Sequence, residues 1–134
     1  MVIDSSALLS IVFGEPERDA FVEVIFRATD EGRMVYIPAT VIVEAGMAAE
    51  RRRHVEKLDG LLARITSEIV PLDYAIAQLA RAAHRRFGRG FHKAALNFGD
   101  CMTYATALYL RAPLLYKGDD FRRTGIPSAL PMPN

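Results

Sequence analysis

The stretch Met1-Val2-Ile3-Asp4-Ser5-Ser6-Ala7-Leu8, at the start of the chain, decides the fold. A continuously apolar run reaches a carboxylate at Asp4 and passes at once into residues suited to a helix. Such a run indicates a short strand buried on both faces. Ser5 and Ser6 are good N-caps for a helix through Val12, although Asp4 is an equally good one. The chain therefore opens as a β-α unit with an acid at the junction.

The same alternation continues along the chain. Further apolar strands are predicted at 34–37, 69–72 and 114–116, with a last short one at 127–130. Further helices are predicted at 16–31, 40–52, 55–65, 74–87 and 100–110. Strands that alternate with helices predict a mostly parallel sheet in a three-layer α/β/α sandwich. Ligands of such open sheets bind at the carboxyl ends of the strands, so candidate site residues are sought there.

The length and composition favour a single folded domain, residues 1–134. There is room for one sizeable core, and the hydrophobic fraction of 51% argues against disorder. No apolar run reaches the ~18 residues that a membrane span needs, and the early acid does not fit a signal peptide. Cys101 is the single cysteine and cannot form an internal disulfide. We therefore expect a cytoplasmic protein without a membrane partner.

Four acidic positions fall where the predicted strands end or helices begin. Asp4 follows the first strand, and Asp119 and Asp120 follow the strand at 114–116. Asp100 is predicted to open the last helix. Each has an ordinary explanation, as a helix cap, a first-turn acid or a turn residue. Their convergence on one edge of the sheet is harder to explain in that way.

Glu44 interrupts the otherwise apolar helix segment Val41–Ala49, and no basic residue follows before Arg51. A carboxylate in apolar surroundings is costly unless it is paired or bound to a metal. The alternative is that this face of the helix is open to solvent and that Glu44 is a surface acid. The sequence leaves both interpretations open.

Basic residues are clustered although the net charge is only +1. Arg81, Arg85 and Arg89 recur every four residues, which predicts one shared helix face. Such a row can hold a phosphate backbone or simply solvate the surface. The nearby acids favour RNA, and we predict that Arg85 and Arg89 help to position it.

Three further stretches carry a family resemblance together with the opening one: Thr40 to Gly46, Gly88 to Ala105 with its core Leu96-Asn97-Phe98-Gly99-Asp100-Cys101, and Leu114 to Phe121. They occur in order and at suitable spacing over essentially the whole chain. The chain resembles a PIN-domain nuclease and, within that family, the VapC toxins of VapBC toxin–antitoxin pairs. This resemblance implies a Mg²⁺-dependent endoribonuclease toxin that hydrolyses RNA phosphodiester bonds. It also implies a homodimer and a VapB-like antitoxin that covers the active site.

The resemblance carries Asp4, Glu44 and Asp100 over as an acidic triad, with Asp119 or Asp120 as the fourth acid. Mg²⁺ or Mn²⁺ is the expected cofactor, because hard cations prefer oxygen ligands. A bound metal can activate water and stabilise the transition state. Direct ligation is predicted for Asp4 and Asp100, and Asp119 is carried as a further possible ligand. Glu44 is either a ligand or the group that positions the attacking water.

Ser6 and Thr103 are further predicted to support the site or position the substrate. Two other classes of protein remain as alternatives. A catalytically silent PIN-fold binding module would not need the intact acids. A Mg²⁺-dependent phosphatase-like α/β domain would need a second carboxylate soon after Asp4, where this chain has Ser5 and Ser6.

Overall fold

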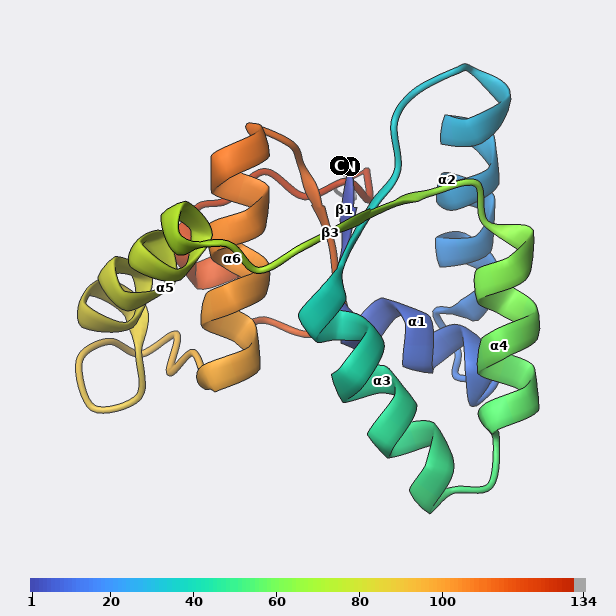
Figure 1. The fold of residues 1–134 in the computed structure, drawn as a ribbon, viewed down its shortest axis with the longest axis horizontal. Helices are drawn as coiled ribbons and strands as arrows, with labels where there is room; N and C mark the ends of the chain where they lie inside the picture. The colour runs from blue at the N-terminus through green and yellow to red at the C-terminus, as the bar shows by residue number, and fades with distance from the viewer. Residues whose placement is uncertain (132–134) are drawn as a thin grey trace.

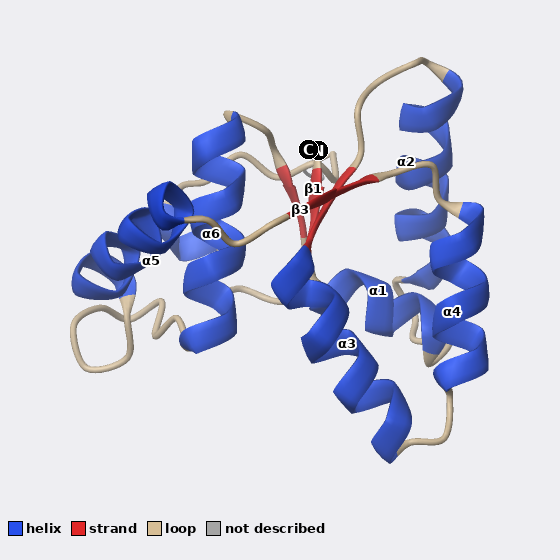
Figure 2. Ribbon diagram, in the orientation of Figure 1, coloured by secondary structure: helices blue, strands red, loops and turns tan. Residues whose placement is uncertain are grey.

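In the computed structural model, which describes residues 1–131, a four-stranded sheet lies between two layers of helices (Figures 1 and 2). All pairings are parallel, in the order β3-β2-β1-β4. The strands are β1 (Val2–Ile3), β2 (Tyr36–Pro38), β3 (Glu68–Val70) and β4 (Leu114–Leu115). The predicted three-layer α/β/α sandwich is confirmed. The last three residues of the domain predicted at 1–134 lie outside the described part.

Six helices cover the two faces of the sheet. One side carries α1 (Ser5–Val12), α2 (Arg18–Asp30), α3 (Ala39–Arg51) and α4 (Val55–Arg64). The other side carries α5 (Tyr74–Phe87) and α6 (Phe98–Leu110), which pack against each other. A short 3₁₀ turn, η1 (Arg122–Thr124), follows β4. No helix among residues 1–131 is both long and apolar enough to cross a membrane.

The strands β1 and β4 are continuously apolar because each contributes to two cores. Ile3 and Leu115 belong to the core shared with α1 to α4, whereas their neighbours Val2 and Leu114 belong to the core shared with α5 and α6. Successive side chains of a strand point to opposite faces, so both faces of β1 and β4 are fully buried.

The pairing of β1 with β4 fixes where the chain's first acid lies. Val2 is opposite Leu114 and Ile3 is opposite Leu115. The backbone N–H of Asp4 continues this ladder by donating to the carbonyl oxygen of Leu115 at 2.9 Å. The residues that follow the two strands therefore leave the sheet at the same edge.

Three predictions near the site or at the end of the chain are corrected by the structure. The helix predicted at 100–110 begins at Phe98, because Asn97 caps it and places Asp100 in its first turn. The strand predicted at 127–130 is reduced to a single bridge between Ser128 and Leu114. The predicted helix face of Arg81, Arg85 and Arg89 is wrong, because α5 ends at Phe87 and the chain at Gly88 is extended.

Candidate active site

Asp4 lies at the junction of β1 and α1, and its side chain is almost fully buried, with the residue 3% exposed. Its Oδ2 caps α1 by accepting hydrogen bonds from the Ser6 backbone N–H (3.1 Å) and hydroxyl (2.6 Å). Its Oδ1 is buried and has no hydrogen-bond partner. The cap thus uses one oxygen of this carboxylate and leaves the other without a partner.

Burial raises the pKa of Asp4, because removal from water disfavours the charged form. The two hydrogen bonds from Ser6 oppose this increase, and the Glu44 carboxylate adds to it. The Thr103 hydroxyl makes the smallest contribution and also lowers the pKa. A buried acceptor without a partner is costly in a folded protein, so Oδ1 is a candidate atom for binding a ligand.

Asp100 occupies the first turn of α6 and completes a capping box with Asn97. The Asn97 Oδ1 accepts from the Asp100 backbone N–H at 2.9 Å, and the Asp100 Oδ2 accepts from the Asn97 backbone N–H at 3.1 Å. Burial raises the pKa of Asp100 to about 6, against the lowering effect of the Asn97 hydrogen bond. Repulsion from Asp4, Glu44 and Asp120 adds to the increase, so these three carboxylates lie close enough to act on Asp100.

Glu44 projects from α3 into the same site. It is half-buried, and its Oε1 accepts a hydrogen bond from the Ser5 hydroxyl. The other end of the carboxylate packs against Gly99 of α6. Glu44 is therefore not an isolated surface acid, which was the alternative that its sequence context left open.

The two acids of the final turn differ in their surroundings, although both are exposed. Asp120 is the one whose charge raises the pKa of Asp100. Asp119 instead raises the pKa of Tyr116, whose pKa is raised chiefly by burial. Of the two, Asp120 is therefore the acid whose charge is seen to act on Asp100.

Ser6 and Thr103, predicted to support the site, both lie beside Asp4. The Ser6 hydroxyl donates to Asp4 and accepts from the Lys117 backbone N–H at 3.0 Å, which joins α1 to the turn after β4. Thr103 is buried in α6. Sequence reasoning assigned no role in the site to Ser5 and did not recognise the Asn97 cap. The spacing Asn97-x-x-Asp100 is a capping-box pattern and was a readable signal for that cap.

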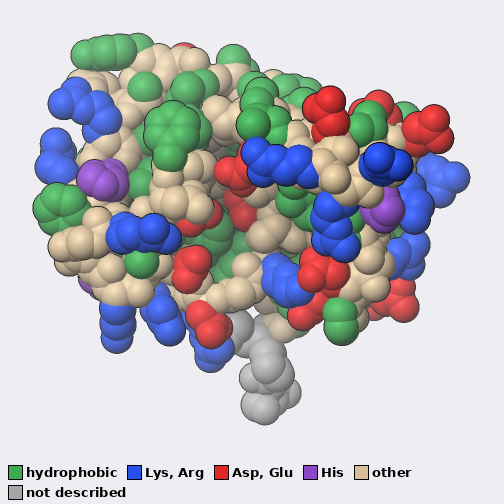
Figure 3. Space-filling view, turned by 90° about the horizontal axis from the view of Figure 1, so that it is seen from below, with side chains coloured by type: hydrophobic (Ala, Val, Ile, Leu, Met, Phe, Trp, Pro, Cys, Tyr) green, Lys and Arg blue, Asp and Glu red, His purple; other side chains and the backbone are tan. Residues whose placement is uncertain are grey.

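A groove of about 810 Å³ runs between α5 and the start of α6. Arg81 and Arg85 of α5 line it together with Arg89 from the following loop, so the three arginines share a groove rather than a helix face. Phe98 also lines it, beside the acids, with 83% of its surface exposed. Figure 3, which looks at the molecule from below, shows acidic side chains around a central depression with basic side chains to both sides.

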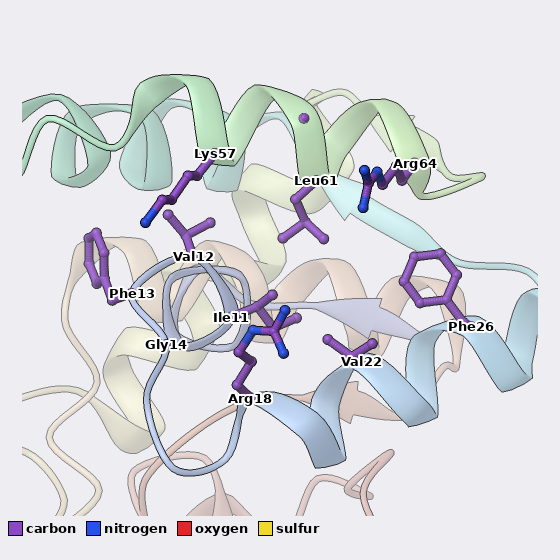
Figure 4. A pocket seen from close by; sticks show the side chains of 11 residues that line it. Ile11, Val12, Phe13, Gly14, Arg18, Val22, Phe26, Lys57, Leu61 and Arg64 are labelled. Carbon is purple, nitrogen blue, oxygen red and sulfur yellow. The ribbon is translucent and has the colours of Figure 1, made fainter.

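A second hollow, of about 500 Å³, lies between α1, α2 and α4 (Figure 4). Its apolar lining includes Val22 and Leu61, and the basic side chains Arg18, Lys57 and Arg64 surround it. None of the predicted acids lines this hollow, so it is separate from the candidate site.

The acids form an open set of oxygen donors. Within residues 1–131, no three or more His, Cys, Asp or Glu side chains already stand as a closed metal cluster. Mg²⁺ does not need such a cluster, because it is commonly held by one or two carboxylates and keeps several waters. The unpartnered Oδ1 of Asp4 and the repulsion at Asp100 are both features that a divalent cation would relieve. The residues present therefore fit a metal.

Residues 1–127 match the PIN domain family. The chain belongs to this family. Ribonuclease VapC28 of Mycobacterium tuberculosis is 38% identical to this PIN domain over 134 residues, which cover 97% of this chain and 98% of that relative. The predicted resemblance to PIN-domain VapC toxins is confirmed.

Solved structures give the same fold. VapC20 of Mycobacterium tuberculosis, described as a sarcin-ricin loop cleaving toxin, matches with a TM-score of 0.75 at 14% identity, over 97% of this chain and 98% of that one. VapBC2 from Rickettsia felis, bound to a DNA fragment from its promoter, matches with a TM-score of 0.74 at 15% identity, over 94% and 92% of the two chains.

The raised pKa of Asp100 predicts that the metal-free PIN domain loses stability as the pH rises from about 4 to about 6. Between its ordinary value of 3.8 and the folded value of about 6, the folded chain binds more protons than the unfolded one. The free energy of unfolding therefore falls as the pH rises through this window. Asp100→Asn should remove the penalty and raise that free energy near pH 8 by on the order of 1 kcal/mol, since partial exposure screens the charges.

Urea unfolding of the metal-free wild type and Asp100→Asn, near pH 4 and near pH 8, checks this expectation. Asparagine keeps an oxygen that accepts the Asn97 N–H, so the cap of α6 survives in this variant. Asp100→Ala is the control that loses the cap as well. An equal change of stability for Asp100→Asn at both pH values would contradict the assignment.

Proposed function

We propose that this chain is a metal-dependent endoribonuclease and the toxin of a toxin–antitoxin pair. Its membership of the PIN domain family and its similarity to the ribonuclease VapC28 support the ribonuclease activity. The observation that carries the proposal is the buried, unpartnered Oδ1 of Asp4 beside the mutually repelling Glu44 and Asp100. A silent binding module would have no use for so costly a group.

Asp4 and Asp100 would hold a Mg²⁺ or Mn²⁺ ion as direct ligands, with Glu44 as a third ligand or as the residue that orients the attacking water. Once bound, the metal lowers the pKa of a coordinated water and stabilises the charge that develops on the phosphate. Among the two acids of the final turn, we favour Asp120 as the fourth, because its charge acts on Asp100 whereas that of Asp119 acts on Tyr116.

The rest of the site orients these carboxylates. Ser6 fixes one oxygen of Asp4, Ser5 fixes one oxygen of Glu44, and Asn97 fixes one oxygen of Asp100. In each acid, the second oxygen is the one available to a metal or a water molecule. Ser5 and Ser6 also occupy the positions where a phosphatase-like domain would need a second carboxylate, so nothing favours that alternative.

The substrate we propose is RNA, with its phosphates held by Arg85 and Arg89 in the groove beside Asp100. Opposite charge draws the backbone to the arginines, and the exposed ring of Phe98 offers a surface on which a base can stack. A VapB-like antitoxin is the proposed partner, supported by the match to a VapBC complex. A homodimer and a cytoplasmic location complete the proposal.

Cleavage of RNA should require both the acids and a divalent cation. Purified protein incubated with total RNA is expected to cut it with added Mg²⁺ or Mn²⁺ and to stop when EDTA is present. Asp100→Asn should reduce the rate by about a thousandfold or more while leaving the far-UV circular dichroism spectrum unchanged. Activity that is indifferent to EDTA would rule out the metal-dependent mechanism. Mapping the cleaved ends would identify the substrate.

Replacing the two acids of the final turn one at a time should separate them. Asp120→Asn is expected to slow cleavage and to lower the pKa of Asp100, because a repelling charge is removed. Asp119→Asn is the matched control and should leave the cleavage rate within about twofold of the wild type. Rates for both variants under saturating metal, with NMR titration of Asp100, provide the measurement. The reverse pattern would make Asp119 the fourth acid.

The double variant Arg85→Gln, Arg89→Gln should weaken RNA binding with little loss of chemistry. We expect KM for RNA to rise about tenfold, kcat to change little, and the salt dependence of KM to become shallower, because two phosphate contacts are lost. Arg27→Gln, on the surface of α2, is the control and should have no effect. An unchanged KM would show that the arginines only solvate the groove.

A further inference from the structure

We propose that Gly99 is a positioning residue of the active site, whose missing side chain makes room for the Glu44 carboxylate between α3 and α6. The inference rests on the proposed metal-dependent function, in which Gly99 has no role so far. The backbone does not require a glycine at this position, but the position of the Glu44 side chain does.

The backbone at Gly99 is ordinary helix. Gly99 is the second residue of α6, and it does not belong to the glycines with positive φ, which are Gly14, Gly32, Gly90, Gly118 and Gly125. Alanine is favoured over glycine in helices because glycine loses more backbone entropy on folding. Judged by secondary structure alone, alanine would suit this position better.

The space above Gly99 is taken by Glu44. A Cβ at residue 99 would overlap the Glu44 Oε2 and lie 3.0 Å from its Cδ. The two other glycines inside helices, Gly46 of α3 and Gly60 of α4, have nothing within 4 Å of such a Cβ. The close approach is thus specific to the one helical glycine that faces a site acid.

Glu44 is held from both sides in this arrangement. The Ser5 hydroxyl of α1 binds its Oε1, and the amino-terminal turn of α6, where the helix dipole favours a negative charge, lies against its Oε2. The Glu44 charge also acts on Asp4 and Asp100, whose pKa values it raises. Repulsion from these acids disfavours this position of the Glu44 carboxylate. The carboxylate can still occupy it because Gly99 has no side chain there.

A methyl group at residue 99 would displace the carboxylate rather than the helix. The atoms it meets are the far end of a flexible side chain, which can turn away at little cost. Glu44 would then lose its hydrogen bond to Ser5 and its place beside Asp4 and Asp100. Gly99→Ala is therefore expected to damage metal binding without damaging the fold.

Binding of Mn²⁺ alone to the full-length protein, measured by isothermal titration calorimetry without RNA, tests the proposal together with thermal unfolding. Gly99→Ala should weaken Mn²⁺ binding by about tenfold or more, in the range found when an outer partner of a metal ligand is lost. Its metal-free Tm should equal or exceed that of the wild type. Gly46→Ala, on the same helix as Glu44, is the matched control and should bind Mn²⁺ as the wild type does.

A compensating variant separates positioning from packing. Glu44→Asp shortens the acid by one methylene, which makes room for a methyl group at residue 99. We expect the combined variant Gly99→Ala, Glu44→Asp to bind Mn²⁺ more tightly than Gly99→Ala alone, so that the two losses are not additive. If Gly99 served only packing, Gly99→Ala would instead lower Tm, and adding Glu44→Asp would not restore Mn²⁺ binding.

The outcomes distinguish this inference from the proposed function. If the wild type itself does not bind Mn²⁺, the metal site fails and the proposed function fails with it. If the wild type binds Mn²⁺ and Gly99→Ala binds it equally well, the metal site stands and the role of Gly99 is overturned. A lowered Tm without rescue by Glu44→Asp overturns it too.

Discussion

Mutual repulsion between the carboxylates of Asp4, Glu44 and Asp100 is the constraint that the rest of the structure has to satisfy. The acids come from three separate elements, and burial adds to their repulsion by removing the water that would screen it. An unanchored side chain would move outward under these forces. Each carboxylate is instead fixed by one oxygen to a neighbour: Ser6, Ser5 and Asn97 respectively.

Two of these hydrogen-bonded pairs, Asp4 with Ser6 and Asp100 with Asn97, also cap the starts of helices. Asp4 caps α1 and Asp100 closes the capping box of α6, so the hydrogen bonds that start the helices also aim the acids. The free energy gained from these capping hydrogen bonds thus offsets part of the cost of bringing the carboxylates close together. The interpretation of Asp4 and Asp100 as residues that stabilise helix starts is therefore compatible with a role in the site, because a carboxylate has two oxygens and each interpretation uses one.

The fold could be predicted from the sequence wherever the signal was local. The helices predicted at 16–31 and 74–87 lie within two residues of those bounds in the structure, and the apolar strands appear near their predicted positions. The start of α6 was misplaced by two residues because the capping pattern of Asn97 was not recognised. Arg89 was placed on a helix because its spacing fits one, although the helix ends before it.

Contacts between distant residues were beyond the reach of periodicity. The half-burial of Glu44 depends on α1 and α6, which lie 39 and 55 residues away at the positions of its neighbours Ser5 and Gly99. The difference between Asp119 and Asp120 depends on how the turn after β4 faces α6. Neither follows from residue type or spacing.

The sheet order has a consequence for how the protein is made. Of the four strands, β1 is synthesised first and β4 last, yet the two are neighbours in the sheet, with β1 in its interior. Asp4 and Glu44 are synthesised early, but Asp100 and the Lys117 amide that Ser6 binds come late. A growing chain therefore carries separate acids and no assembled site until most of its length has been translated. For a ribonuclease, that order of synthesis separates the making of the chain from the start of its activity.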